Sequence, residues 1–462
     1  MGINPKVFSS GSTYKILIKF AIPAMFALLV TELYNMVDTF FVGQFIGPNA
    51  IAALTVAFPI QRFLSALAFL IGVGASTYVS RYSGENSSEK VKGTIENAVL
   101  MIIICTIVIP FLLFLCRGTI LYKLGASDVT FGYTNTYVSI ILLGALFQGL
   151  TIVSTSIMTA LGNSKITLYA NSLGAILNII IDYILVAHLS IGIAGAAIAT
   201  IFSQFIALCF ALYKFKDVIK HFNISFTPKQ IVNTLDIVLI KGIIAVGFST
   251  FIIEISDAVV SVVLNNLLIS RGGDNAIIMV GVITKISMFM FITIIGISSA
   301  MQPIVAFNYG ARNFERVKST IKASIKTVTI TSLIFAVILM WFAPQCISLF
   351  LTDKELIPET VQAFRIVISL LPLVGFYYVG IYYYQAIDDA KKGFRLSLFR
   401  QLIVFIPIAV ILVNTIGIMG AWIAYPISDL ISAIASFYLL NSNSSEKESA
   451  IKIGRSQKVL PN

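Results

Sequence analysis

Long apolar runs that recur along the whole chain constrain its fold more than any other sequence feature. Each run is long enough to cross roughly 30 Å of hydrocarbon at about 1.5 Å per residue. Of the 462 residues, 58% are hydrophobic and only 11% are charged, whereas a soluble domain carries about 25% charged residues. The runs are continuous rather than alternating, which indicates helices instead of a β-barrel. The sequence therefore predicts an all-α polytopic membrane protein with about twelve transmembrane helices.

The expected membrane spans are separated by polar or basic loops. They cover residues 15–42, 50–80, 93–116, 131–158, 165–187, 191–214, 236–268, 276–307, 316–341, 359–386, 394–414 and 418–440. We expect an N-lobe of helices 1–6 at residues 1–222 and a C-lobe of helices 7–12 at residues 223–440, joined by a cytoplasmic loop. The serine- and lysine-rich tail at 441–462 is expected to be cytoplasmic and disordered.

Basic residues are unevenly divided between the loops on the two sides. The odd-numbered loops hold only a few, whereas the N-terminus, the even-numbered loops and the tail hold most of them. The positive-inside rule then places both termini in the cytoplasm of a multi-pass protein of the cell (plasma) membrane. The net charge of +11 could indicate nucleic-acid binding. Its position in these loops argues for the lipid bilayer as the partner and against nucleic acid.

An internal repeat divides the chain into two halves. The segment Ile191–Ala199 matches Ile416–Ala424, and the segment Gly84–Ile95 matches Gly310–Ile321. The offset is 225 or 226 residues in both matches, which composition bias cannot produce. Because each half crosses the membrane an even number of times, both six-helix bundles have the same orientation, as in transporters that work by alternating access.

Carboxylates within the apolar runs are the strongest functional signal. Each costs at least about 2.5–3.5 kcal/mol at mid-helix, so such residues usually face an aqueous cavity. Asn178 and Asp182 lie one helical turn apart on one face, Asp38 lies in the first helix, and Thr200 in the sixth offers a hydroxyl. These hard oxygen ligands suit a small cation such as Na⁺. Alternatively, two close carboxylates would share a proton, so residue types leave Na⁺ and H⁺ both open as the coupling ion. No other cofactor is expected.

A purely structural role for this set is the alternative, because polar side chains often tie transmembrane helices together. At the repeat offset, however, Asp182 falls on Pro407, Asp38 on Leu264 and Asn178 on Ile403. A scaffold role would more naturally be kept in both halves. A site in one half only favours a function added to a symmetric frame.

Other residues are weaker candidates. Glu254 and Asp257 share a helical face, and with Glu32 they could attract a cationic substrate or form a second ion route; they could also pair with a base such as Lys285. Pro23, in the same helix as Asp38, could couple helix bending to cation occupancy or simply be a static kink. The candidate substrate contacts, chosen as adaptable aromatic, Met or polar residues, are Tyr34, Met36, Gln148, Tyr382 and Gln385.

Three segments carry a family resemblance. They are Asn35–Gly43, the Gly-Asn-Ser-Lys turn at Gly162–Lys165, and Pro303 followed by Asn308-Tyr309-Gly310. Over about residues 10 to 440 the chain resembles the multidrug and toxic compound extrusion (MATE) family, closest to its bacterial DinF-like and MepA-like branches.

The resemblance implies a V-shaped, two-lobed antiporter that exports organic cations against inward Na⁺ or H⁺. It implies an N-lobe cation site whose residue types match Asp38, Asn178, Asp182 and Thr200. Another branch pairs a Glu of helix 7 with an Asp of helix 10. Glu254 fits the first, but helix 10 has no Asp before the cytoplasmic Asp388.

The function expected from these observations is export of small, mostly cationic drugs and toxic compounds, and hence antibiotic resistance, by a cation-coupled transporter that works as a monomer. A lipid-linked oligosaccharide flippase of the same wider group is the alternative, but it should carry basic residues in its cleft to meet pyrophosphate. An enzyme is not expected, because His188 and His221 lie near helix ends without HExxH spacing.

Overall fold

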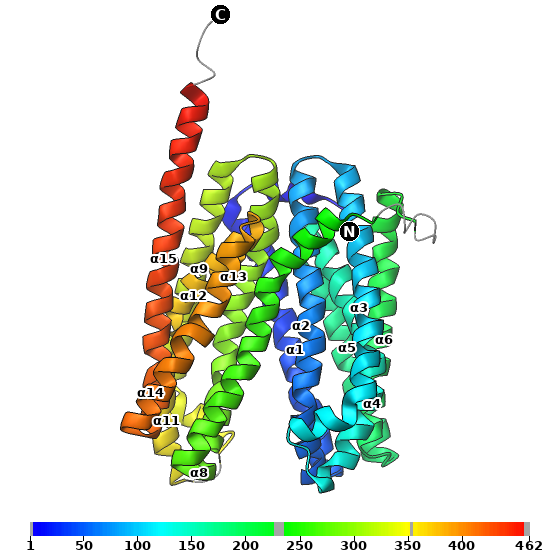
Figure 1. The fold of residues 1–462 in the computed structure, drawn as a ribbon, viewed down its shortest axis with the longest axis vertical. Helices are drawn as coiled ribbons and strands as arrows, with labels where there is room; N and C mark the ends of the chain where they lie inside the picture. Colours follow the sequence, from blue (N-terminus) through cyan, green and yellow to red (C-terminus); the bar gives the residue numbers. More distant parts are fainter. Residues whose placement is uncertain (1–2, 226–234, 352–353, 457–462) are drawn as a thin grey trace, which may run out of the picture. The chain divides into compact units, whose positions relative to one another are not determined.

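The computed structural model describes residues 3–225, 235–351 and 354–456, and every regular element in these ranges is helical (Figure 1). Twelve helical segments are long and apolar enough to cross a membrane. Each coincides with one predicted span to within several residues, which confirms the predicted fold class. Apolar run length was therefore sufficient to locate the spans, because the hydrocarbon thickness fixes the length that a spanning helix needs.

The helices are bounded as follows, in chain order. They are η1 Pro5–Ser9, α1 Thr13–Phe45, α2 Pro48–Gly84, α3 Ser88–Lys123, α4 Asp128–Ala160, α5 Ile166–Asp182, η2 Tyr183–His188, α6 Ile193–His221, α8 Ile237–Gly310, α9 Phe314–Trp341, α10 Ala343–Ser348, α11 Leu356–Ile368, η3 Leu371–Leu373, α12 Val374–Ala386, α13 Ala390–Leu398, η4 Phe399–Phe405, α14 Ile406–Ile416 and α15 Ile418–Ser456. The long helix α8 carries two spans, because Gly273 leaves the helical conformation at φ 59°.

The last helix continues beyond the predicted end of the last span. The span itself ends at Leu440 as expected, but α15 runs on to Ser456, where the sequence led us to expect a disordered tail. Residues 457–462 and the centre of the predicted inter-lobe loop, 226–234, lie outside the described residues.

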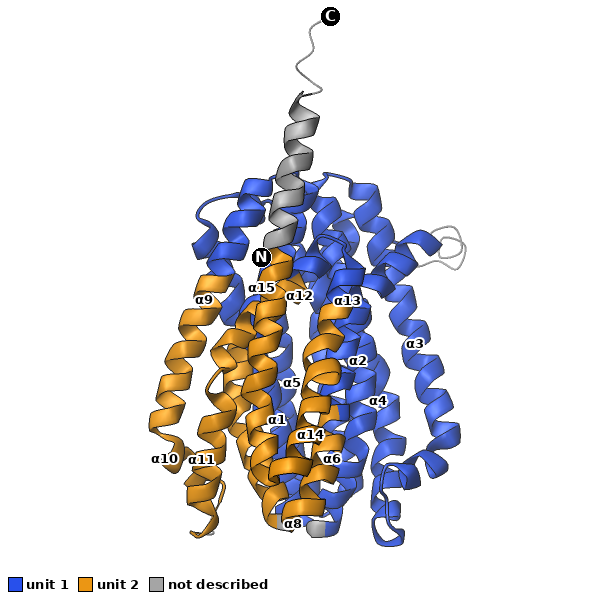
Figure 2. Cartoon of the chain, turned by 60° about the vertical axis from the view of Figure 1, so that its left-hand side comes forward, with its two compact units in different colours: residues 1–259, 295–324, 383–394 blue, residues 260–294, 325–382, 395–462 orange. Residues whose placement is uncertain are grey.

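Two compact units divide the chain in a way that the repeat does not (Figure 2). Unit 1 comprises residues 1–259, 295–324 and 383–394, and unit 2 comprises residues 260–294, 325–382 and 395–462. Unit 1 therefore contains the whole first repeat together with three pieces of the second. The predicted lobes follow the repeat in sequence, whereas the units follow the packing.

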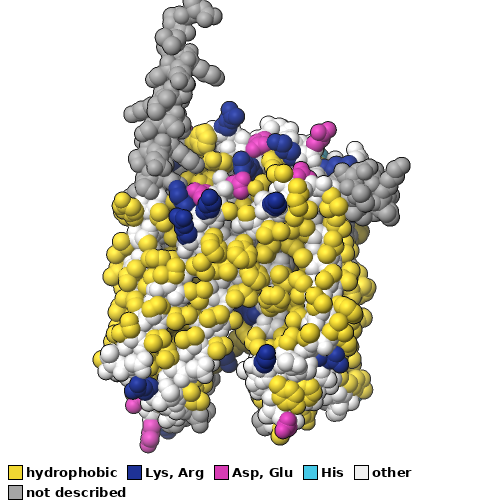
Figure 3. Space-filling model, viewed as in Figure 1, with side chains coloured by type: hydrophobic (Ala, Val, Ile, Leu, Met, Phe, Trp, Pro, Cys, Tyr) yellow, Lys and Arg dark blue, Asp and Glu magenta, His cyan; other side chains and the backbone are white. Residues whose placement is uncertain are grey.

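In unit 1, α2 packs on α4, α4 on α6 and α1 on α5. One apolar cluster includes the fully buried Ile95, Ile157 and Phe215, and a second includes Val42 and Leu121. In unit 2, α15 packs on α14, α11 and η4. On the face in Figure 3, apolar side chains cover the middle of the helices and charged side chains lie toward helix ends. This pattern is expected of helices whose outer surface contacts lipid.

The repeat is visible in the backbone as well as in the sequence. Gly192 and Gly417, which precede α6 and α15, have φ/ψ of 73°/−153° and 70°/−152°. Asn86 and Arg312, which follow α2 and α8, are both left-handed, at φ 55° and 56°. These pairs are separated by 225 and 226 residues, so the repeated segments share turn geometry.

Candidate cation site

The four residues of the predicted cation site are all buried in unit 1. Asp38 of α1 is 7% exposed, and Asn178 and Asp182 of α5 and Thr200 of α6 are at most 1% exposed. Asn178 and Asp182 share the buried face of α5 because they lie one helical turn apart. Immediately after Asp182 the helix widens into the π-helical segment η2, a distortion that is frequent at functional sites.

The structure brings the side chains of these residues together. The carboxyl groups of Asp38 and Asp182 lie close enough to interact with one another, and Asp182 also faces Asn178. The phenol of Tyr34 lies against Thr200 and near both carboxyl groups. Tyr34, which the sequence suggested as a substrate contact, is therefore a neighbour of the cation site.

Most polar atoms of the site have no hydrogen-bond partner among the described residues. They are Asp38 Oδ1, both side-chain polar atoms of Asn178, both carboxylate oxygens of Asp182 and Thr200 Oγ1. A buried polar atom without a partner costs about 1–3 kcal/mol, and more if it is charged. So many together in one place are unusual for a scaffold, whose buried polar atoms pair with one another.

The donor chemistry fits a small hard cation or a proton. Two carboxylates, an amide oxygen and a hydroxyl are the ligands that such ions prefer. Among the described residues there is no group of three or more His, Cys, Asp or Glu side chains suited to holding a metal ion. The site thus differs from the clusters that bind transition metals, and its two acids have no basic partner in the salt bridges of the described residues.

A buried acid in unit 2 provides the contrast. Asp429 of α15 is fully buried and accepts hydrogen bonds from Arg400 Nε and Nη2 at 3.0 and 2.9 Å. The guanidinium also lies over the ring of Phe291, 5.5 Å from its centroid. Sequence reasoning missed Asp429. The signal that could have found it was Arg400 itself, because a basic residue inside an apolar helix needs a counter-charge.

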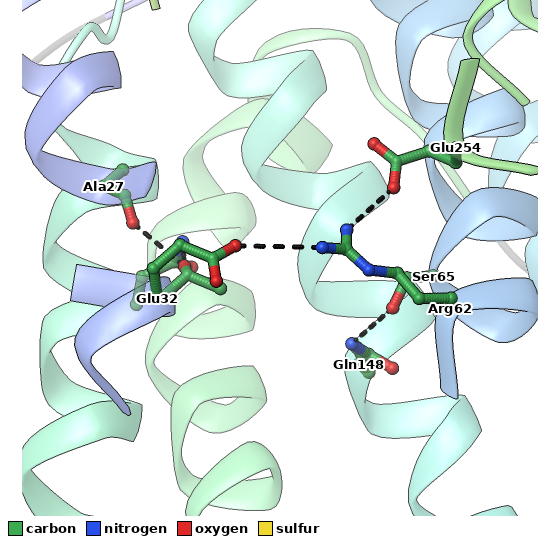
Figure 4. A network of polar contacts seen from close by, with 8 residues as sticks. Ala27, Glu32, Arg62, Ser65, Gln148 and Glu254 are labelled. Carbon is green, nitrogen blue, oxygen red and sulfur yellow. Dashed lines mark hydrogen bonds and ion pairs between the residues drawn. The ribbon is translucent and has the colours of Figure 1, made fainter. Parts of the chain in front are cut away.

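A second charged cluster lies in unit 1, where Arg62 of α2 stands between two acids (Figure 4). Arg62 Nη1 is 2.9 Å from Glu254 Oε2 of α8, and Nη2 is 4.0 Å from Glu32 Oε1 of α1. All three side chains are partly exposed, at 33%, 20% and 24%. Asp257 is exposed and adds a third negative charge near Arg62. The sequence suggested Lys285 as a base for Glu254, but the structure gives that role to Arg62.

The remaining sequence candidates are spread over other places. Gln148 donates a hydrogen bond to Ser65 Oγ at 3.0 Å, and Met36 is exposed. The other three are Tyr382, which is buried in unit 2, Gln385, whose amide bonds Gln302 and Thr250, and Pro23, which is buried within the continuous helix α1. The structure therefore does not gather the predicted substrate contacts into one place.

Comparisons with known proteins place the chain among membrane transporters. Residues 23–184 and 245–411 match the MatE family model. Among curated proteins, the chain is 25% identical over 435 residues to a multidrug export protein MepA of Staphylococcus saprophyticus, covering 94% of both chains. It is 26% identical over 442 residues to the MepA of Staphylococcus haemolyticus, covering 94% of this chain and 95% of the other.

Solved structures of similar proteins cover nearly the whole chain. A crystal structure of a MATE protein in complex with MaD3S superposes with a TM-score of 0.90 at 25% identity, covering 96% of this chain and 99% of the other. An outward-facing multidrug resistance MATE transporter of the MOP superfamily gives a TM-score of 0.89 at 26% identity, covering 96% and 98%. A MOP superfamily transporter from Pyrococcus furiosus, described as having a binding pocket of reversed polarity, gives 0.89 at 25%, covering 96% and 98%.

Proposed function

The chain belongs to the MatE family, and on that basis we propose that it is a multidrug efflux transporter driven by an inward gradient of Na⁺ or H⁺. The observation that carries the coupling half of this proposal is the buried pair Asp38 and Asp182, whose oxygens have no hydrogen-bond partner among the described residues apart from Asp38 Oδ2. The proposal also takes the basic loops and both termini to be cytoplasmic, and the single chain to be the working unit.

Four residues would hold the coupling ion. A bound Na⁺ would be ligated by oxygens of Asp38, Asn178, Asp182 and Thr200, and a proton would be held between the two carboxyl groups; either supplies the positive charge that the site lacks. With that charge present, the carboxylates of Asp38 on α1 and Asp182 on α5 attract one centre, and without it they repel each other. Occupancy therefore biases how closely α1 approaches α5. Because Glu32 also lies on α1, the same bias reaches the second charged cluster.

The second charged cluster is the proposed contact for substrate. Three acids, Glu32, Glu254 and Asp257, face the single base Arg62, so the cluster carries an excess of negative charge. Part of each ion-paired side chain is exposed, so a ligand can compete for the acids. This charge balance favours organic cations. A flippase for pyrophosphate-linked lipids would require the opposite sign, because its ligand is an anion.

Reconstituted transport tests the proposal. Efflux of a fluorescent organic cation from proteoliposomes would be measured under an imposed Na⁺ gradient, an imposed pH difference or neither, for wild type, Asp38→Asn and Asp182→Asn. Asp217→Asn, which changes an exposed acid of α6, is the matched control. We expect one gradient to drive efflux in wild type and the control, and neither mutant of the site to respond.

Two outcomes would contradict parts of the proposal. If the site mutants transport as wild type does, the coupling ion binds elsewhere and the site is structural. If no gradient moves any organic cation while a pyrophosphate-linked lipid is translocated, the flippase alternative replaces the exporter.

A further inference from the structure

The turn between α12 and α13 contains an aspartate in a conformation that favours glycine. Asp388 has φ 65°. Its repeat counterpart, 226 residues earlier, is Gly162, with φ 99°. The two turns have the same hydrogen bonds: the amides of Gly162 and Asn163 bond the carbonyls three and five residues before them, and so do those of Asp388 and Asp389. The first repeat thus meets the need for a left-handed residue with glycine, and the second does not.

An aspartate is a costlier choice than glycine at this position. A Cβ atom disfavours the left-handed region, although Asp and Asn tolerate it better than other residues. Residues held in disfavoured backbone regions cluster where a side chain has a task. The side-chain contacts of Asp388 identify the task.

The carboxylate of Asp388 binds two side chains of α2. Arg81 Nη1 is 2.9 Å from Oδ2, and the hydroxyl of Tyr78 donates to Oδ1 and Oδ2 at 2.9 and 3.0 Å. Tyr78 and Arg81 belong to the first repeat and Asp388 to the second, more than 300 residues away. The contact therefore joins the two repeats, and it lies wholly within unit 1.

Close packing of helix ends surrounds this contact. A Cβ atom on Gly84 would lie 2.0 Å from the carbonyl oxygen of Phe307, and one on Gly310 would lie 2.1 Å from that of Arg81. Each residue of one contact is 226 positions from its counterpart in the other, so α2 and α8 meet reciprocally, as two halves related by a two-fold axis do. Asp388 has no such mirrored partner: the same turn of the first repeat carries Gly162, which has no side chain to bind.

The exposure of the ion pair distinguishes it from a permanent scaffold. The side chains of Arg81 and Asp388 are 26% and 30% exposed, whereas those of Arg400 and Asp429 in unit 2 are 6% and 1% exposed. A buried pair is costly to separate because one charge is then left in a low dielectric. A half-exposed pair gives each partner access to water on separation, so it can open and close repeatedly at low cost.

We propose that Asp388 is the latch of a gate at the basic-loop ends of α2 and α8, and that it releases Tyr78 and Arg81 each time the transport path opens on that side. The proposal rests on the transport function proposed above, since only a transporter needs such an opening. The carboxylate of Asp388 is the one acceptor shared by both side chains of α2. Removing it should shift the resting population toward the open state without disturbing the fold.

Cysteine labelling measures the gate without substrate or coupling ion. Ser249 of α8 is fully buried, and its Oγ would lie 3.0 Å from a Cβ on Gly393 of α13, so it lies beneath this contact. In a background with the four native cysteines replaced by alanine, the Ser249→Cys reporter would be treated with a water-soluble maleimide. A Ser154→Cys reporter in α4, also buried, shows whether the fold itself has loosened.

Two substitutions of Asp388 and one matched control make the test specific. Asparagine and glycine both accept the left-handed backbone, so Asp388→Asn and Asp388→Gly remove the acceptor charge without adding strain. Asp389→Asn removes the adjacent charge, whose ion-pair partner Lys392 lies on the same helix, 3.5 Å away. We expect both Asp388 variants to label about three- to tenfold faster at Ser249→Cys, as loss of a half-exposed ion pair and one hydrogen bond implies.

The control variant and the Ser154→Cys reporter should label at the wild-type rate. Unchanged labelling at Ser249→Cys in both Asp388 variants overturns the latch, and so does an equal rise at both reporters, which would mean general unfolding. Because the readout needs no transport, a failure here is distinguishable from a failure of the exporter proposal.

Discussion

The same chemical change, aspartate to asparagine, should have opposite effects on stability at two buried positions. At Asp429 the carboxylate is the counter-charge of Arg400, with two hydrogen bonds of 2.9 and 3.0 Å and almost no exposure. At Asp182 both carboxylate oxygens lack a hydrogen-bond partner among the described residues, and the nearest charge is that of Asp38. The first substitution breaks an ion pair, and the second removes a repulsion.

The magnitudes follow from this difference. Asp429→Asn leaves a buried guanidinium without its counter-charge, which costs about 3–5 kcal/mol of the free energy of unfolding. Asp182→Asn removes a buried charge that nothing balances, so in Na⁺-free buffer we expect no loss and a gain of up to about 1–2 kcal/mol. A double variant, Arg400→Gln with Asp429→Asn, contains no buried charge and should recover most of the loss.

Reversible unfolding of the purified protein in mixed micelles is the assay, with the fraction folded followed by circular dichroism for each variant. The coupling between Arg400 and Asp429 is obtained from the double-mutant cycle. The reasoning is refuted if the losses of Arg400→Gln and Asp429→Asn simply add in the double variant, or if Asp182→Asn is as damaging as Asp429→Asn.

Two further predictions concern α2. Gly84→Ala and Gly310→Ala each place a Cβ about 2 Å from a facing carbonyl oxygen and should cost roughly 1–3 kcal/mol of stability by thermal melting, whereas Gly132→Ala, which has open space, should cost nothing; equal effects at all three would contradict the close packing. Arg62→Gln leaves Glu254 without its counter-charge and should tighten binding of a fluorescent organic cation by about fivefold at low salt, measured by fluorescence polarisation; weaker binding would mean that Arg62 itself orients the ligand.

The spans and the cation site could be predicted because their signals are local. Hydrocarbon thickness fixes the length of a spanning helix, and Asn178 and Asp182 share a face through helical periodicity alone. A carboxylate in an apolar helix is costly wherever it lies, so Asp38 stands out without any knowledge of its neighbours. The repeat added what single helices lack, because the absence of this set from the second half argued against a scaffold.

Partners distant in sequence could not be predicted. Arg62 pairs with Glu254 across 192 positions, and Arg81 with Asp388 across 307, and no helical pattern encodes those contacts. The compact units also depart from the repeat, because close approaches such as that of Gly247 to the carbonyl of Leu70 pack parts of the second repeat into unit 1. Asp388 was taken for an ordinary cytoplasmic loop acid, since its left-handed backbone is visible only in the structure.

The most direct test of the central claim, that Asp38 and Asp182 hold the coupling ion, is equilibrium binding of that ion to the purified protein. Binding of radioactive Na⁺ and uptake of protons near neutral pH would be measured in wild type, Asp38→Asn, Asp182→Asn and Glu254→Gln. We predict that wild type binds one of the two ions, that Glu254→Gln binds it equally, and that both aspartate variants lose it. Retained binding in the aspartate variants, with loss in Glu254→Gln, would contradict the account.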